Sequence, residues 1–179
     1  MRTQAPARRK LRSDYARVAI VVAGLFAALS FVERGVSGRA LVGALFSATL
    51  VILAAYDLEH RIIPNRIVLP AAGVVFVLQV ALFPDRGLEW TLAALGSSGF
   101  LLIMLLAYPA GLGMGDVKLC LLLGAALGNA VVMAMILGLL AASMLGVILL
   151  LSQGASARKK VVPLGPFLAF GGIAALFLS

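Results

Sequence analysis

Residues 119–151 form a stretch of 33 residues without a single charged side chain. As one α-helix this stretch would be about 50 Å long, whereas the hydrocarbon core of a bilayer is about 30 Å thick. Gly128 and Asn129 lie inside the stretch, and both residue types tolerate turn geometry. The stretch therefore predicts two membrane-spanning helices that meet in a tight hairpin at residues 128–129.

The whole chain is too apolar for a water-soluble domain. Of its 179 residues, 63% are hydrophobic and 12% are charged, and the mean hydropathy is +1.11. Soluble domains carry about 25% charged residues, so this chain lacks the polar surface that water requires. A single cysteine and a single histidine exclude an internal disulfide and argue against a metal site built by the protein. We expect an integral membrane protein that needs no metal or cofactor.

Apolar segments able to cross a bilayer recur along the chain. Seven candidates lie at residues 17–32, 40–56, 67–83, 90–108, 110–128, 130–151 and 163–178. They predict an all-α, polytopic integral membrane helix bundle of about seven transmembrane helices. Residues 1–16 are expected to form a basic cytoplasmic tail, and residues 17–179 a single multi-spanning membrane domain. The fifth span is short unless it begins inside the membrane, near residues 111–116.

The distribution of basic residues predicts the orientation of the bundle. With the amino terminus in the cytoplasm, twelve of the fifteen Lys and Arg residues lie on the inner side and three on the outer side. This is the positive-inside pattern, and an odd number of spans then places the carboxyl terminus outside. The same basic clusters explain the net charge of +8 and favour contact with anionic lipids. We therefore expect no nucleic-acid partner.

Two acidic residues lie at the ends of predicted spans, at similar depth on the cytoplasmic side. Asp57 ends the second span in Tyr-Asp-Leu-Glu-His, and Asp116 opens the fifth in Gly-Met-Gly-Asp-Val-Lys. Ionisable residues within membrane segments are energetically costly and are usually functional. Two carboxyl groups from different helices can divide the work of hydrolysis, one activating a water and the other polarising the scissile carbonyl.

Each aspartate also has a structural interpretation. Asp57 could pair with Arg61 one helical turn later, and Asp116 could cap the amino end of its helix. Arg61 and Lys118 are the neighbouring cations, and either could tune a carboxyl group or contact a substrate. The helix macrodipole favours negative charge at an amino end and disfavours it at a carboxyl end. On that basis we expect Asp116 to act as the base and Asp57 as the acid.

Three segments resemble the type IV prepilin peptidases, membrane aspartyl proteases of the Gly-x-Gly-Asp type. They are residues 57–65 (DLEHRIIPN), 113–119 (GMGDVKL) and 163–169 (PLGPFLA), in the order and with the intervening hydropathy of that family. The resemblance implies an endopeptidase that removes the basic leader peptide of type IV prepilins or pseudopilins. It also implies action at the cytoplasmic face of the bacterial inner membrane without a cofactor.

The resemblance assigns roles to individual residues. Asp57 and Asp116 correspond to the catalytic pair. Gly113 and Gly115 shape the loop that presents Asp116, and as glycines they let the backbone take unusual angles and let another chain approach closely. Larger members carry paired cysteines that bind zinc, in a segment associated with N-methylation, and residues 1–16 contain no cysteine. The chain is thus similar to a short, peptidase-only form, and we expect no methyltransferase activity.

Two other functions remain open. Paired carboxyl groups in a membrane also occur in small transporters and proton relays, which usually show repeated halves and charges near the midplane. The sequence shows no such repeat, and both aspartates lie toward one face. An inactive scaffold that binds pilins without cutting them is the second alternative. No sequence feature indicates the oligomeric state.

Overall fold

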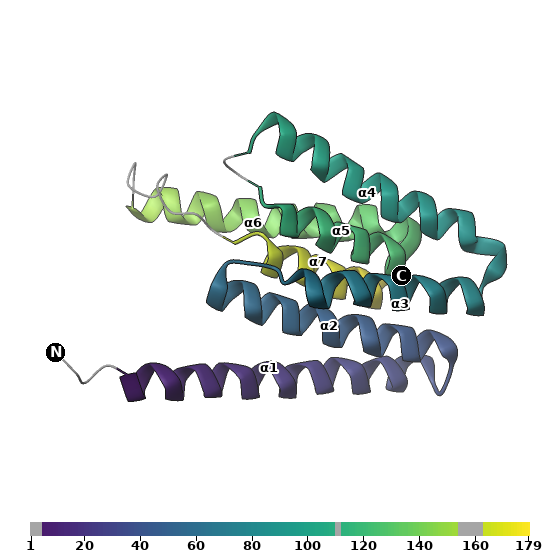
Figure 1. Cartoon of the computed structure of the whole chain (residues 1–179), viewed down its shortest axis with the longest axis horizontal. Coiled ribbons are helices and arrows are strands. Elements are labelled where there is room, and N and C mark those ends of the chain that lie inside the picture. Colours follow the sequence, from purple (N-terminus) through teal and green to yellow (C-terminus); the bar gives the residue numbers. More distant parts are fainter. Residues whose placement is uncertain (1–4, 110–111, 154–162) are drawn as a thin grey trace.

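The computed structural model describes residues 5–109, 112–153 and 163–179, and within these ranges it contains helices but no strand. The chain forms α1 (Ala5–Arg34), α2 (Gly38–His60), α3 (Asn65–Leu82), α4 (Gly87–Ala107), α5 (Met114–Leu127), α6 (Val131–Gln153) and α7 (Gly165–Leu178). Two short 3₁₀ turns, η1 (Pro84–Arg86) and η2 (Gly128–Ala130), precede α4 and α6. The helices run side by side along one direction (Figure 1). The predicted all-α bundle is confirmed.

Four stretches of the described chain are long and apolar enough to cross a membrane. They are α2, α3, the stretch Pro84–Ala107 and the stretch Met114–Ser152, which includes α5, η2 and most of α6. Two shorter apolar helices, Val18–Glu33 and α7, complete the set. The chain is therefore a polytopic membrane helix bundle.

α1 begins earlier than the predicted first span. Residues 5–16, expected to form a basic tail, are helical and continue α1 toward its amino end. The basic cluster at residues 158–160, which also entered the prediction of orientation, lies outside the described residues. The placement of either segment relative to the membrane stays a prediction.

α5 lies at the centre of the bundle. It is 14 residues long, about 21 Å, and ten of its residues are buried. α3, α4, α6 and α7 pack around it (Figure 1). Its carboxyl end is set by Gly128, whose φ of +55° is favourable for glycine, and the chain then turns through η2 into α6. The predicted turn at residues 128–129 is confirmed, whereas α5 is shorter than the predicted span of residues 110–128, of which residues 110–111 lie outside the described residues.

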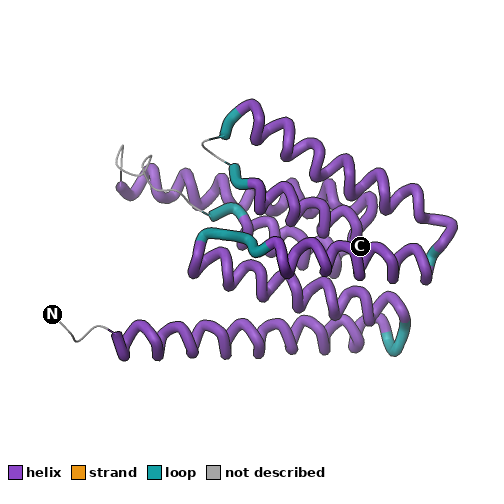
Figure 2. Tube along the Cα trace, viewed as in Figure 1, coloured by secondary structure: helices purple, strands orange, loops and turns teal. Residues whose placement is uncertain are grey.

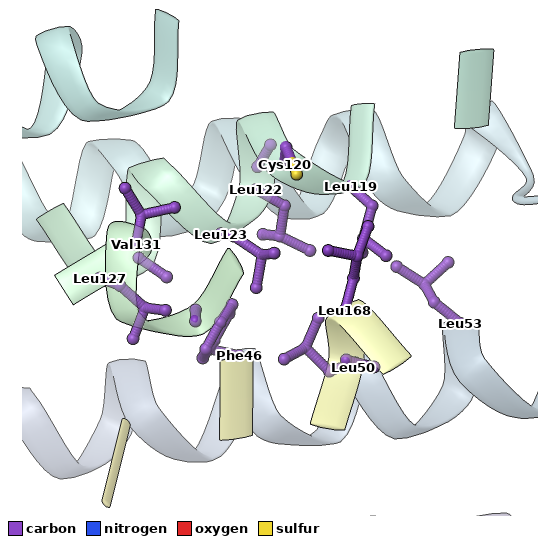
Figure 3. Packing of buried hydrophobic residues seen from close by; sticks show 14 of the residues in the cluster. Phe46, Leu50, Leu53, Leu119, Cys120, Leu122, Leu123, Leu127, Val131 and Leu168 are labelled. Carbon is purple, nitrogen blue, oxygen red and sulfur yellow. The ribbon is translucent and has the colours of Figure 1, made fainter. Parts of the chain in front are cut away.

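The hydrophobic core is built around α5 because this helix is apolar on every side. Its leucines meet the inner faces of α2 and α7 (Figure 3). The large side chains that are almost completely buried include Phe46, Leu50 and Leu53 of α2, Leu119, Leu122 and Leu123 of α5, and Leu168 of α7. This packing holds the ends of α2, α5 and α7 in fixed positions relative to one another.

Gly124 lets α5 lie directly against α4. A Cβ atom at this position would lie 2.5 Å from the Cα atom of Ala94 and would overlap the carbonyl group of Ala93. We predict that Gly124→Ala lowers the free energy of unfolding by about 2 kcal/mol, because the two backbones must separate. Thermal unfolding in detergent measures the effect. Gly96→Ala is the control, since nothing lies within 4 Å of its Cβ position; equal melting temperatures for the two variants would contradict the prediction.

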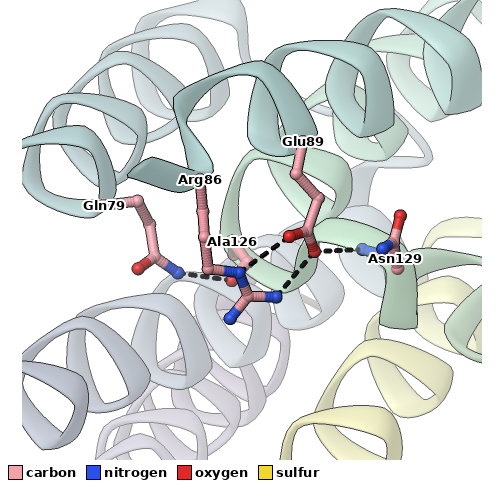
Figure 4. Close-up of polar contacts among 5 residues, drawn as sticks. All are labelled: Gln79, Arg86, Glu89, Ala126 and Asn129. Carbon is pink, nitrogen blue, oxygen red and sulfur yellow. Dashed lines mark hydrogen bonds and ion pairs between the residues drawn. The ribbon is translucent and has the colours of Figure 1, made fainter. Parts of the chain in front are cut away.

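A group of polar residues joins α3, α4 and α5 at the end of the bundle where α5 finishes (Figure 4). The guanidinium group of Arg86 donates two hydrogen bonds of 2.7 Å to the carboxylate of Glu89. Glu89 also accepts the backbone N–H of Asn129 at 3.3 Å, and the Gln79 amide donates to the Ala126 carbonyl at 2.7 Å. We call these five residues the distal clasp.

Candidate active site

Three segments that are distant in sequence meet at the other end of the bundle. Asp57 lies in the last turn of α2, Asp116 in the first turn of α5, and Gly165 at the start of α7. The loops beside these helix ends gather at one end of the molecule (Figure 2). Both aspartates are buried, with exposed fractions of 6% for Asp57 and 8% for Asp116. Their carboxyl groups are close enough for a charge on one to act on the other.

A pocket of about 420 Å³ opens beside the two carboxyl groups. Its walls come from the segment that follows α2 and from the first turn of α5. The pocket is lined by all six residues that the sequence singled out, namely Asp57, Arg61, Gly113, Gly115, Asp116 and Lys118. A buried pair of acids beside an open pocket is an arrangement suited to general acid–base chemistry.

Asp116 is held by the turn that starts α5. One of its carboxyl oxygens accepts the backbone N–H of Gly113 at 3.0 Å, and its own N–H donates to the Gly113 carbonyl at 3.0 Å. Asp116 therefore stabilises the amino end of its helix, as the structural interpretation proposed. It does so from the third helical position, whereas the N-cap residue is Gly113. A carboxylate has two oxygens with several lone pairs, so this role leaves acceptor capacity for a ligand in the pocket.

Asp57 is held from outside its own helix. The backbone of Gly165, at the start of α7, lies against the Asp57 carboxyl group, and the Gly165 N–H interacts with it. The alternative ion pair with Arg61 does not form within the described residues. Instead the backbone N–H of Arg61 donates to the Asp57 carbonyl at 2.7 Å. Arg61 has a φ of +54° and ends α2 in the left-handed conformation, with its side chain exposed at the rim of the pocket.

The amino ends of two helices thus face the two acids, α5 at Asp116 and α7 at Asp57. The expected positions are confirmed, with Asp57 at the carboxyl end of α2 and Asp116 at the amino end of α5. The amino end of α7 beside Asp57 reduces the expected difference in macrodipole between the two acids, and the assignment of Asp116 as the base stays a prediction. Sequence reasoning gave Gly165 no role of its own. The sequence nevertheless contained a signal for a helix start that approaches another segment closely. Gly165 is followed by Pro166, and proline favours the first turn of a helix while glycine permits close approach.

The two glycines before Asp116 differ in their surroundings. Gly113 has ordinary extended angles (φ −109°, ψ 152°), and a Cβ atom there would lie 3.4 Å from the Asp116 carboxyl group. The idea of unusual backbone angles at Gly113 is therefore wrong. A Cβ atom at Gly115 would lie 2.9 Å from the Cβ of Ile63. Close approach of another chain, the second reason given by the sequence, applies to Gly115.

The sequence profile of the type IV leader peptidase family matches residues 44–151, a range that includes both aspartates. The chain belongs to this family. Among similar family members, the prepilin leader peptidase/N-methyltransferase of Bacillus subtilis is 30% identical over 171 residues, which cover 90% of this chain and 64% of the relative. The protein of the same name from Burkholderia pseudomallei is 31% identical over 170 residues, covering 89% and 53% respectively.

The chain therefore spans roughly half to two thirds of the length of these leader peptidase relatives. No solved structure matches it significantly. The family profile ends before α7, so it does not include Gly165, and the contact between Gly165 and Asp57 is taken from the structure of this chain.

Lys118 connects two walls of the pocket in this leader peptidase family member. Its ammonium group donates to the side-chain oxygen of Asn65 at 2.8 Å, which joins the second turn of α5 to the first residue of α3. Within the described residues it forms no ion pair with either aspartate. The tuning role expected of Lys118 would then act through the position of α5 rather than through a direct contact.

The glycine pair of this family member gives a matched test. We predict that Gly115→Ala lowers catalytic activity at least tenfold, because Ile63 must move and the wall of the pocket moves with it. Gly113→Ala should retain most of the activity, since its new methyl group meets only ordinary contacts. Initial rates of substrate cleavage with both variants in the same lipid measure the difference. Equal losses of activity in the two variants would show that the need for glycine at position 115 does not come from its packing against Ile63.

Proposed function

We propose that this protein is an aspartyl endopeptidase that removes the leader peptide of type IV prepilins or pseudopilins. The main support is geometric: two buried aspartates from different helices line one pocket, in a chain of the leader peptidase family. The similar proteins of Bacillus subtilis and Burkholderia pseudomallei are named prepilin leader peptidases, which agrees with this substrate class.

In the proposed mechanism Asp57 and Asp116 share one proton. The ionised carboxylate accepts a proton from a water in the pocket, and that water attacks the scissile carbonyl carbon. The neutral carboxyl group donates a hydrogen bond to the carbonyl oxygen as negative charge develops there. A proton then passes to the departing amine and the peptide bond breaks. Each aspartate is held by one backbone N–H, from Gly113 or Gly165, which fixes its position for these steps.

We further propose that the pocket faces the cytoplasm in the bacterial inner membrane, with the amino terminus inside and the carboxyl terminus outside. α1 begins at the same end of the bundle as the pocket, and the chain ends at the opposite end (Figure 1). The positive-inside pattern then assigns the pocket end to the cytoplasm. Labelling of single cysteines at Ser37 and Asn65 from each side of the membrane tests this orientation; labelling of Asn65→Cys from outside would reverse it.

The decisive experiment is incubation of a prepilin with the purified protein in lipid vesicles, followed by mass spectrometry of the products. We expect one cut that separates a leader from the mature protein. An intact substrate together with proton flux across the vesicle membrane would favour the transporter instead. An intact substrate that nevertheless binds would indicate the inactive scaffold.

A further inference from the structure

A second, larger hollow of the molecule is an apolar groove of about 890 Å³ between α1, α2 and α7. α2 forms its floor, where Ala54 and Ala55 leave room, and α1 and α7 form its two walls. α1 packs along α2 (Figure 1). At the far end of the groove the rings of Phe26 and Phe177 meet, with 6.0 Å between their centroids. The groove is therefore closed at one end.

The open end of the groove lies beside the candidate active site. Leu58 and Glu59, which line the groove, directly follow Asp57, and Pro166 directly follows Gly165. A chain segment that leaves the groove at this end therefore needs to pass only the end of α2 or the start of α7 to reach the two carboxyl groups.

The dimensions of the groove fit a short piece of helix. Along α1 its lining extends from Val18 to Phe26, about 12 Å at 1.5 Å per residue. Two turns of a helix about 10 Å in diameter occupy roughly 850 Å³, close to the volume of the groove. A complete membrane span of a second copy would need about 30 Å, more than twice the distance to the closed end.

The chemistry of the lining indicates what kind of helix it accepts. Within the described residues the lining is apolar except for Glu59, which lies at the open end. A segment at membrane depth must be helical to satisfy its backbone, and its cytoplasmic flank is usually rich in Lys and Arg. An apolar helix with basic residues before it would thus place the helix in the groove and the basic residues near Glu59.

We propose that this groove holds the first two turns of the hydrophobic helix of the substrate, which begins directly after the cleaved bond. The inference rests on the proposed function and adds the place on this chain where the apolar helix of the substrate lies, between α1, α2 and α7.

Photocrosslinking tests this placement. The reactive amino acid p-benzoylphenylalanine replaces Phe170, which lines the groove and is 58% exposed, in protein reconstituted with a prepilin. The matched control replaces Phe100 of α4, which is 51% exposed and lies away from the groove. We expect the Phe170 probe to crosslink the substrate several times more strongly, with the crosslink in the apolar segment after the cut.

The outcomes separate this inference from the proposed function, because cleavage by the unmodified protein is measured in parallel. Cleavage without a preferential crosslink at Phe170, or with crosslinks there to lipid alone, would overturn the groove assignment and leave the peptidase intact. Absence of cleavage would count against the peptidase itself. A crosslink to the basic leader would reverse the orientation inferred for the substrate.

A groove-filling variant gives an independent measurement. Ala55→Trp narrows the floor and should raise the KM for a full-length substrate about tenfold or more. The control is Ala107→Trp. Ala107 is exposed at the carboxyl end of α4, at the same end of the bundle as the candidate active site, and its replacement should leave the KM unchanged. An unchanged KM in Ala55→Trp would contradict the proposal.

Discussion

Replacing either Asp57 or Asp116 with asparagine is expected to lower prepilin cleavage by at least about 10³-fold. Asparagine preserves the size of the side chain but neither accepts nor delivers the proton that hydrolysis requires. Because the two acids are expected to act as one unit, the double variant should be hardly slower than either single variant. Initial rates with purified protein in lipid vesicles measure the losses, and melting temperatures show whether the bundle remains folded.

Asp85→Asn is the matched control for these variants. Asp85 is exposed in η1, at the opposite end of the bundle from the pocket, so the same chemical change should leave the rate near that of the unaltered protein. Cleavage that survives in Asp57→Asn or Asp116→Asn would refute the catalytic pair. Loss of activity accompanied by a large fall in melting temperature would instead assign the residue a structural role.

Gly165→Ala is expected to reduce activity about 100-fold while the protein remains folded. A Cβ atom at this position would lie 2.6 Å from a carboxyl oxygen of Asp57 and 3.1 Å from its carboxyl carbon. The carboxyl group must therefore move away from the backbone N–H that holds it, and a displacement of about 1 Å can cost 10²-fold in rate. The measurement is kcat with a saturating substrate, because the change acts on the acid rather than on substrate binding.

Gly99→Ala provides the control for Gly165→Ala, since nothing lies within 4 Å of a Cβ atom at residue 99. The control should retain full activity. Normal kcat in Gly165→Ala would show that Asp57 does not need to lie against the start of α7 during the reaction. We would then conclude that α7 has no part in positioning the catalytic residues.

Much of the fold could be predicted from the sequence because membrane helices are specified locally. An apolar run of known length defines a span, and the charge-free stretch of residues 119–151 required a turn at Gly128 and Asn129. The two acids were also visible locally, because charged residues are rare in such segments. Their meeting in one pocket followed from the predicted depth of each helix end.

The details of the site depend on contacts between distant segments, which no local pattern determines. The N–H group of Gly165 reaches Asp57 only because α7 packs beside α2. The Lys118–Asn65 bond likewise depends on how α3 and α5 pack together. The left-handed conformation of Arg61 was also hidden, because arginine rarely adopts it.

The distal clasp has a mechanical consequence for the acids at the other end. It fixes the carboxyl end of α5 to α3 and α4 through Ala126 and Asn129, so α5 is anchored where it is farthest from Asp116. From Ala126 to Asp116 the helix rises about 15 Å, at 1.5 Å per residue. A tilt of α5 by about 10° around the clasp would carry the Asp116 end by about 2.6 Å, given that rise. The clasp and the packed core therefore act together to keep Asp116 in place beside Asp57.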